Sequence, residues 1–91
     1  MELIRPGQAG SVESSDILIL IGPNDKGKGI EWHLESPVKN IYGDKIKQEI
    51  EEVLHKYKIR DAIVQVTDRG ALPFTVKARA EAAILRAIKK D

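Results

Sequence analysis

The chain has 91 residues, with 15 Lys and Arg against 14 Asp and Glu, so its net charge is only +1. Its length predicts one small domain spanning residues 1–91, and its near-neutral charge gives no overall field that would attract nucleic acid. The lack of cysteine excludes a disulfide framework, a thiolate zinc site and a cysteine nucleophile. The longest apolar run, residues 17–21, is too short to span a membrane, and no secretory signal is recognisable, so we expect a cytoplasmic protein.

The first third of the chain predicts a lead-in arm followed by a β-hairpin. Residues 1–9 contain Pro6 and Gly7 and are interpreted as the arm, and a short strand could begin at Val12. Residues 16–21 form an apolar run typical of a strand that is buried on both faces. After a polar, glycine-rich turn at 24–29, apolar and polar residues alternate over 30–35, which predicts a second strand with one face inward.

A long amphipathic helix is predicted after the pair Ser36-Pro37, because serine caps helices and proline is tolerated at the first helical position. Apolar residues recur every three or four positions for about twenty residues. They are Val38, Ile41, Tyr42, Ile46, Ile50, Val53, Leu54 and Tyr57.

The last third of the chain predicts a second hairpin and a terminal helix. Residues 62–67 resemble a strand, residues 68–70 a turn, and the alternation over 72–78 a further strand. From Arg79 onward an alanine-rich stripe indicates a helix: Ala80, Ala83, Ile84, Ala87 and Ile88. The predicted fold is therefore α+β: a mainly antiparallel sheet of two hairpins packed against a long central helix and a C-terminal helix.

Few residues fit a catalytic or metal site. His33 lies on the outward face of a predicted strand and His55 on the solvated side of the helix, so neither predicts a catalytic triad or metal ligation. The turn at 24–29 lacks the phosphate-loop pattern. Residues 69–91 carry six basic and two acidic side chains, a pattern that suits a solvated face or a docking surface for an acidic partner or RNA.

The segment Gly10-Ser11-Val12-Glu13-Ser14-Ser15-Asp16 places three hydroxyls beside two carboxylates with no histidine or other base nearby. A hydroxyl without a base is a poor nucleophilic catalyst but a usable attachment point. Taken alone, the segment favours a turn with local hydrogen bonds.

Three stretches together resemble the acyl carrier protein of citrate lyase, its gamma subunit. They are residues 9–16, residues 42–46 (Tyr-Gly-Asp-Lys-Ile), and residues 68–82. Their order and spacing extend over nearly the whole chain. The first is similar to the family pattern Ala-Gly-[Ser/Thr]-x-Glu-Ser-Gly-Asp, and this match aligns Ser14 with the serine that carries the prosthetic group.

The resemblance implies a non-catalytic carrier subunit. Ser14 would be linked through a phosphodiester to 2′-(5″-phosphoribosyl)-3′-dephospho-coenzyme A, whose thiol carries acetyl and citryl groups while citrate is cleaved to oxaloacetate and acetate. The implied partners are the alpha and beta subunits of citrate lyase and a prosthetic-group transferase. Glu13 and Asp16 match the pattern too, and we expect them to help the transferase recognise the site.

The chain departs from the pattern at Ser15, where the family usually has glycine, so Ser15 is a rival attachment site. Two other functions stay open. One is the related carrier subunit of malonate decarboxylase, and the other is a small RNA- or protein-binding domain that uses the basic terminal helix.

Overall fold

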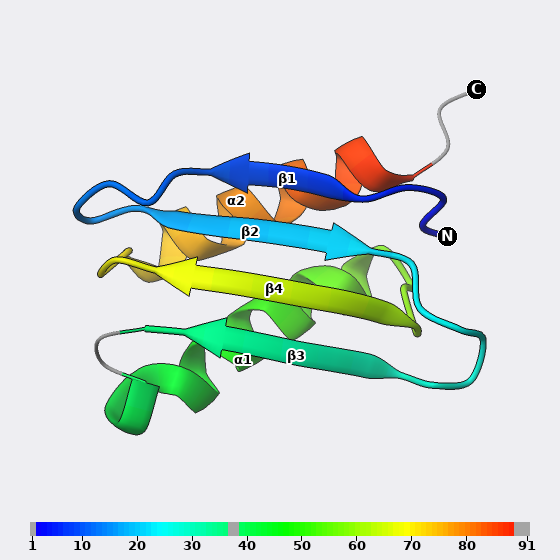
Figure 1. Ribbon diagram of the computed structural model, residues 1–91, viewed down its shortest axis with the longest axis horizontal. Coiled ribbons are helices and arrows are strands. Elements are labelled where there is room, and N and C mark those ends of the chain that lie inside the picture. The colour runs from blue at the N-terminus through cyan, green and yellow to red at the C-terminus, as the bar shows by residue number, and fades with distance from the viewer. Residues whose placement is uncertain (1, 37–38, 89–91) are drawn as a thin grey trace.

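The computed structural model describes residues 2–36 and 39–88 and shows one four-stranded sheet with two helices on one face (Figure 1). The elements in chain order are β1 (Gly7–Gly10), β2 (Ile17–Gly22), β3 (Ile30–Glu35), α1 (Lys39–Lys56), β4 (Ala62–Asp68) and α2 (Pro73–Ala87). The predicted α+β class with a long central helix is therefore confirmed. Val38 of the predicted helix lies outside the described residues.

The strand order is β1-β2-β4-β3, so the two strands predicted to form the first hairpin are not neighbours. β2 pairs antiparallel with β1 and with β4, while β3 pairs in parallel with β4. The link over residues 23–29 therefore passes the end of β4, a step of about 10 Å between alternate strands. The predicted hairpin over 16–36 is wrong because a polar turn signals a change of direction but not which strands pair.

The second predicted hairpin is also wrong, because α2 begins at Pro73 and not at Arg79. Leu72, Phe74 and Val76 alternate with polar residues, but of these only Val76 is buried, whereas Leu72 and Phe74 are 59% and 70% exposed. Proline at the first helical position lacks only an N–H that would have no partner within the helix. The predicted alanine-rich stripe is confirmed, since all five of its members are buried.

Part of the predicted lead-in arm is strand β1, whose residues pair with Leu18–Ile21 of β2. Gly7 lies directly against α2: a Cβ atom there would overlap the carbonyl oxygen of Ala83 and lie 2.8 Å from the nitrogen of Ala87. Glycine on the strand and alanine on the helix therefore allow the two backbones to approach closely. The predicted lead-in arm therefore supplies an edge strand of the sheet.

The core lies between the sheet and the two helices. The inward-facing residues of β2 and β4 are fully or almost fully buried: Ile17, Ile19, Ile21, Ala62, Val64 and Val66. α1 contributes Ile46, Ile50, Val53 and Leu54. Glu52 of α1 forms an ion pair with Lys77 of α2, and Tyr57, directly after α1, donates a hydrogen bond to Glu81 of α2.

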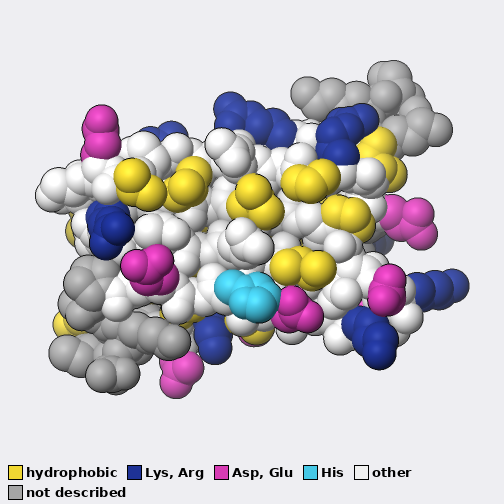
Figure 2. Space-filling model, in the orientation of Figure 1, with side chains coloured by type: hydrophobic (Ala, Val, Ile, Leu, Met, Phe, Trp, Pro, Cys, Tyr) yellow, Lys and Arg dark blue, Asp and Glu magenta, His cyan; other side chains and the backbone are white. Residues whose placement is uncertain are grey.

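The opposite face of the sheet is open to solvent, which Figure 2 shows directly. Leu18 and Leu20 of β2 and Ile63 of β4 are half-buried there. Leu20 is in register with Gln65 of β4, which in turn is in register with His33 of β3. The predicted burial of β2 on both faces is therefore wrong: the strand is apolar on both faces, but helices cover only one of them.

Candidate functional site

The loop between β1 and β2, residues 11–16, contains all three candidate hydroxyls and is held by backbone hydrogen bonds on both sides. The Ser15 N–H donates to the Arg69 carbonyl (2.8 Å), and the Arg69 N–H donates to the Asp16 carbonyl (2.9 Å). Within the loop, the Asp16 N–H donates to the Glu13 carbonyl (3.1 Å). These contacts extend the β2–β4 pairing into the loop and leave its tip, residues 12–14, exposed.

Asp16 is the main side-chain support of this loop. Its carboxylate accepts hydrogen bonds from the Ile17 N–H (2.7 Å), the Ser11 hydroxyl (2.8 Å) and the Arg79 guanidinium (3.1 Å). The bond from Ile17, followed by those from Ser11 and Arg79, lowers the pKa of Asp16 from 3.8 to about 2. The contacts of Asp16 position the loop, and its role in recognition by the transferase stays a prediction.

The three serines have different surroundings. The Ser11 hydroxyl is half-buried, donates to Asp16 and accepts a hydrogen bond from the Glu13 N–H (3.3 Å). The Ser14 side chain is exposed, and its hydroxyl has no hydrogen-bond partner among the described residues. The Ser14 hydroxyl is therefore accessible from solvent on a loop that backbone hydrogen bonds hold in place.

Ser15 is exposed as well, but its backbone is in the left-handed region, with φ of 66°. Residues with a Cβ are strained in this region, whereas glycine is not. The structure thus gives a physical reason for the glycine that the family pattern has at this position. Ser15 thus occupies a turn position whose left-handed backbone conformation favours glycine.

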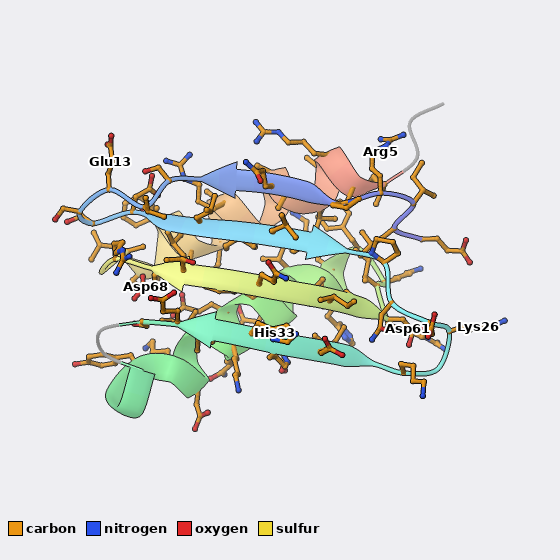
Figure 3. All side chains as sticks on the ribbon, in the orientation of Figure 1. Arg5, Glu13, Lys26, His33, Asp61 and Asp68 are labelled. Atoms are coloured by element: carbon orange, nitrogen blue, oxygen red, sulfur yellow. The ribbon has the colours of Figure 1, made fainter. Side chains whose placement is uncertain are left out.

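Glu13 extends from the loop tip into solvent, as Figure 3 shows. Its carbonyl and N–H take part in the loop hydrogen bonds with Asp16 and Ser11, while its carboxylate makes no hydrogen bond or ion pair with the described residues. The carboxylate of Glu13 is therefore accessible to a binding partner.

Exposed apolar side chains gather at the same end of the molecule, which sequence reasoning missed. Val12 is 53% exposed at the loop tip, and Leu72 and Phe74 are exposed at the start of α2. The loop and the start of α2 lie near each other because both flank the end of β4 (Figure 1). The alternating pattern over 72–78 predicts a strand that includes Leu72 and Phe74. Because that prediction is wrong, it gives no sign that both side chains are exposed.

Two arginines of the basic terminal segment are used inside the fold. Arg79 binds Asp16, and one Arg86 nitrogen donates to the Gln8 carbonyl (2.7 Å). Both residues join α2 to the β1–β2 hairpin. Their charges are therefore only partly available for an acidic partner or RNA.

The histidines lie away from the loop. The exposed His33 side chain contacts Glu31 (2.7 Å), and His55 is exposed on α1. In the described part of the chain no group of three or more His, Asp and Glu side chains could hold a metal ion. Likewise, neither of the helices described over residues 39–88 is long and apolar enough to cross a membrane.

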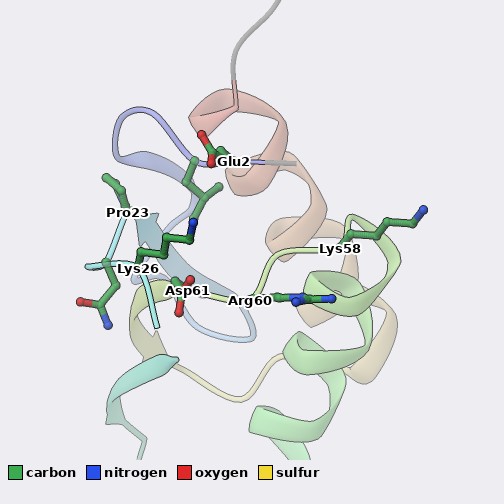
Figure 4. A pocket seen from close by; sticks show the side chains of 8 residues that line it. Glu2, Pro23, Lys26, Lys58, Arg60 and Asp61 are labelled. Atoms are coloured by element: carbon green, nitrogen blue, oxygen red, sulfur yellow. The ribbon is translucent and has the colours of Figure 1, made fainter. Parts of the chain in front are cut away.

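A polar pocket of about 440 Å³ lies at the opposite end of the sheet from the loop (Figure 4). Its lining includes Lys26, Lys58, Arg60 and Asp61. The Asp61 carboxylate accepts hydrogen bonds from the N–H groups of Gly27 and Gly29 (3.1 and 2.8 Å). These turn amides are therefore occupied, which agrees with the absence of a phosphate-loop pattern in the sequence.

Comparisons with known proteins agree with one another. A family model described as "Malonate decarboxylase delta subunit (MdcD)" matches residues 4–87. The chain is 43% identical to citrate lyase acyl carrier protein 2 of Salmonella paratyphi A, over 99% of this chain and 92% of that protein. It is 47% identical to the citrate lyase acyl carrier protein of Lactobacillus helveticus, over 96% and 88% respectively.

A solved structure shares the fold. It is a chain in the crystal structure of a Pseudomonas malonate decarboxylase hetero-tetramer in complex with malonate. The TM-score is 0.66 at 22% sequence identity, and the match covers 93% of this chain and 90% of that one.

Proposed function

Because this chain belongs to the family of citrate lyase acyl carrier proteins, we propose that it is the acyl carrier subunit of a cytoplasmic citrate lyase complex and has no catalytic site of its own. The relatives named as citrate lyase carriers are 40–47% identical to it over nearly its whole length. Its partners would be the alpha and beta subunits of that enzyme.

The observation that carries this proposal is the position of Ser14. Its hydroxyl lies at the tip of a loop that Asp16 and Arg69 hold in place, and it is exposed and unpartnered among the described residues. No histidine lies near enough to make it a catalytic nucleophile, since His33 contacts Glu31 and His55 lies on α1. An accessible, positioned and unactivated hydroxyl suits modification by a separate transferase.

These residues fit a phosphodiester-linked group, and we propose 2′-(5″-phosphoribosyl)-3′-dephospho-coenzyme A attached to Ser14. When attached, the group supplies the thiol that carries the acyl group, and the chain itself contains no cysteine. Asp16 would keep the loop in one conformation, and Glu13 would offer an exposed carboxylate to the transferase.

The same end of the molecule carries the apolar side chains of Val12, at the tip, and of Leu72 and Phe74, at the start of α2, each more than half exposed. Side chains of this kind stabilise protein–protein contacts when they are buried on binding. We place the contact with the alpha and beta subunits at this end, so that the carrier would present its arm toward their active sites.

A second candidate is the carrier subunit of malonate decarboxylase. The matching family model is described as the malonate decarboxylase delta subunit, and the solved structure of similar fold is of a malonate decarboxylase hetero-tetramer. The relatives named as citrate lyase carriers are more similar in sequence, 40–47% against 22% identity, and this favours citrate lyase.

The test is the intact mass of the protein after incubation with the transferase and the activated prosthetic group, followed by peptide mapping. We expect a mass gain of one group in the wild type and in Ser15→Gly, and none in Ser14→Ala. Ser15→Gly is the matched control because glycine suits the left-handed backbone at this position.

A wild type that gains no mass would refute the carrier function, and a gain retained in Ser14→Ala would refute the attachment site. Adding the modified protein to citrate lyase alpha and beta subunits, or to malonate decarboxylase subunits, distinguishes the two complexes. Citrate cleavage only in the first mixture is the expected result.

A further inference from the structure

A second pocket, of about 410 Å³, lies at the same end of the molecule as the Ser14 loop. Its walls come from Ile46 and Glu49 of α1, from Gly70 and Ala71 between β4 and α2, and from Val76 of α2, with Tyr42 at its edge. Its volume is within the range of sites that bind small organic ligands. The lining is mostly apolar, and its charged members are Lys45, Glu49 and Asp68.

The Glu49 side chain is buried, with 7% exposure, and its Oε2 atom has no hydrogen-bond partner within the described residues. Burial raises the pKa of Glu49, while the charges of Lys45 and Lys77 oppose that effect. Glu52 and Asp68 act in the same direction as burial.

Leaving a buried polar atom without a partner is costly, and such atoms are few in folded proteins. Asp68, which also lines the pocket, differs in this respect, since it accepts hydrogen bonds from Ser36 and from the N–H groups of Gly70 and Ala71. Glu49 is thus a residue of the pocket lining with a buried oxygen that lacks a hydrogen-bond partner among the described residues.

The pocket is connected to the attachment loop by the chain itself. Arg69 accepts a hydrogen bond from Ser15 and donates one to Asp16, and the next two residues, Gly70 and Ala71, line the pocket. Figure 3 shows Glu13 of the loop and Asp68 at the end of β4 at the same end of the sheet. A flexible arm that begins at Ser14 therefore starts on the same end of the molecule as the pocket.

We propose that this pocket holds the pantetheine portion of the prosthetic arm while the carrier is not engaged with a partner enzyme. The methyl and methylene groups of that portion match the walls formed by Ile46, Ala71 and Val76. One of its amide N–H groups would donate to Glu49 Oε2 once the Glu49 side chain turns toward the arm. This inference rests on the proposed attachment at Ser14. Tethering makes even weak binding effective, because the arm is present at a high local concentration.

The test compares the protein before and after attachment by NMR, with the attached state verified by intact mass. We expect NOEs between the methyl groups of the arm and those of Ala71 and Val76, together with shifts of the Ile46 and Ala71 signals. The signals of Ile63, on the open face of the sheet, should stay unchanged and serve as an internal reference.

The variant Glu49→Leu removes the acceptor and keeps the position apolar. Exchange of the bound arm amide with solvent should become roughly threefold to tenfold faster than in the wild type, the range for one lost hydrogen bond. Glu51→Gln is the matched control, because Glu51 lies two residues further along the same helix, is exposed and does not line the pocket. It should leave the exchange rate unchanged.

The outcomes separate the two proposals. No mass gain overturns the attachment at Ser14 and this inference with it. A mass gain without NOEs or shifts at Ala71 and Val76 overturns only the pocket assignment. NOEs that persist with the same amide exchange rate in Glu49→Leu would contradict the role of Glu49.

Discussion

Arg79 on α2 binds Asp16, which lies 63 positions earlier in the chain, with 3.1 Å between Nε and Oδ1. A second contact, from Nη2 to Oδ2, measures 3.3 Å. The same carboxylate accepts a hydrogen bond from Ser11, so one side chain connects the terminal helix to both ends of the loop that carries Ser14. The geometry of the candidate attachment site therefore depends on the packing of α2.

The contribution of Asp16 to stability should depend on pH. Its pKa is lowered from 3.8 to about 2, so the unfolded chain binds the proton more readily than the folded one between these values. The stabilisation is complete above about pH 4 and is lost as the pH falls toward 2. In thermal unfolding scans, the difference in Tm between the wild type and Asp16→Asn should shrink over this interval.

Asp25→Asn is the control for this measurement, because the Asp25 carboxylate is exposed and makes no hydrogen bond or ion pair within the described part of the chain. Its difference from the wild type should show no comparable change. A constant Tm difference for Asp16→Asn from pH 5 to pH 2 would contradict the lowered pKa.

Replacing Ser15 with glycine should stabilise the protein or leave it unchanged. Serine at φ of 66° is strained, and relief of that strain offsets the greater freedom of glycine in the unfolded chain. We expect a gain of up to about 1 kcal/mol in the free energy of unfolding, measured with chemical denaturant. Ser14→Gly, at a position without positive φ, should not be stabilising, and the reverse order of the two variants would contradict the assigned backbone geometry.

Adding a methyl group at Gly7 should be clearly destabilising. The new Cβ would overlap the Ala83 carbonyl and crowd the Ala87 nitrogen, both of which belong to the helix backbone and cannot move aside easily. We expect Gly7→Ala to lower the free energy of unfolding by about 1–3 kcal/mol.

Gly22→Ala is the matched substitution on β2, at the same end of the β1–β2 pair as Gly7. There the nearest atom to the new Cβ would be the Pro6 Cα at 3.7 Å, an ordinary contact. A change within about 0.5 kcal/mol is expected, as for a tolerated substitution. Equal destabilisation by the two variants would contradict the close approach of β1 and α2.

Glu49 should show the opposite pH dependence to Asp16. Burial raises its pKa above 4.5, so the folded protein holds the proton more tightly than the unfolded chain. Stability from this residue is present at low pH and declines as the pH rises above about 4.5. Relative to the wild type, Glu49→Gln should therefore become more stable as the pH is raised from 4 to 8, measured as the difference in denaturation midpoint. A difference that does not vary with pH would show that Glu49 titrates normally.

The sequence by itself determined the features that depend on local patterns. The stripe from Ala80 to Ile88 predicted a buried helix face, because the 3.6-residue period is a local pattern that does not depend on how the neighbouring elements are arranged. The central helix was predicted for the same reason, and the aligned motif at residues 9–16 identified Ser14 as the candidate anchor.

Only the tertiary structure decided the relationships between distant segments. Which strand lies beside β2 depends on how the chain buries its apolar faces, so the polar turn at 24–29 could not reveal that β4 lies between β2 and β3. The alternation at Leu72–Val76 predicted a strand, but in the structure a helix begins at Pro73 and packs against β1 and β2. The contact of Asp16 with Arg79 and the burial of Glu49 without a partner arise from that packing, because each depends on residues that only the folded chain brings together.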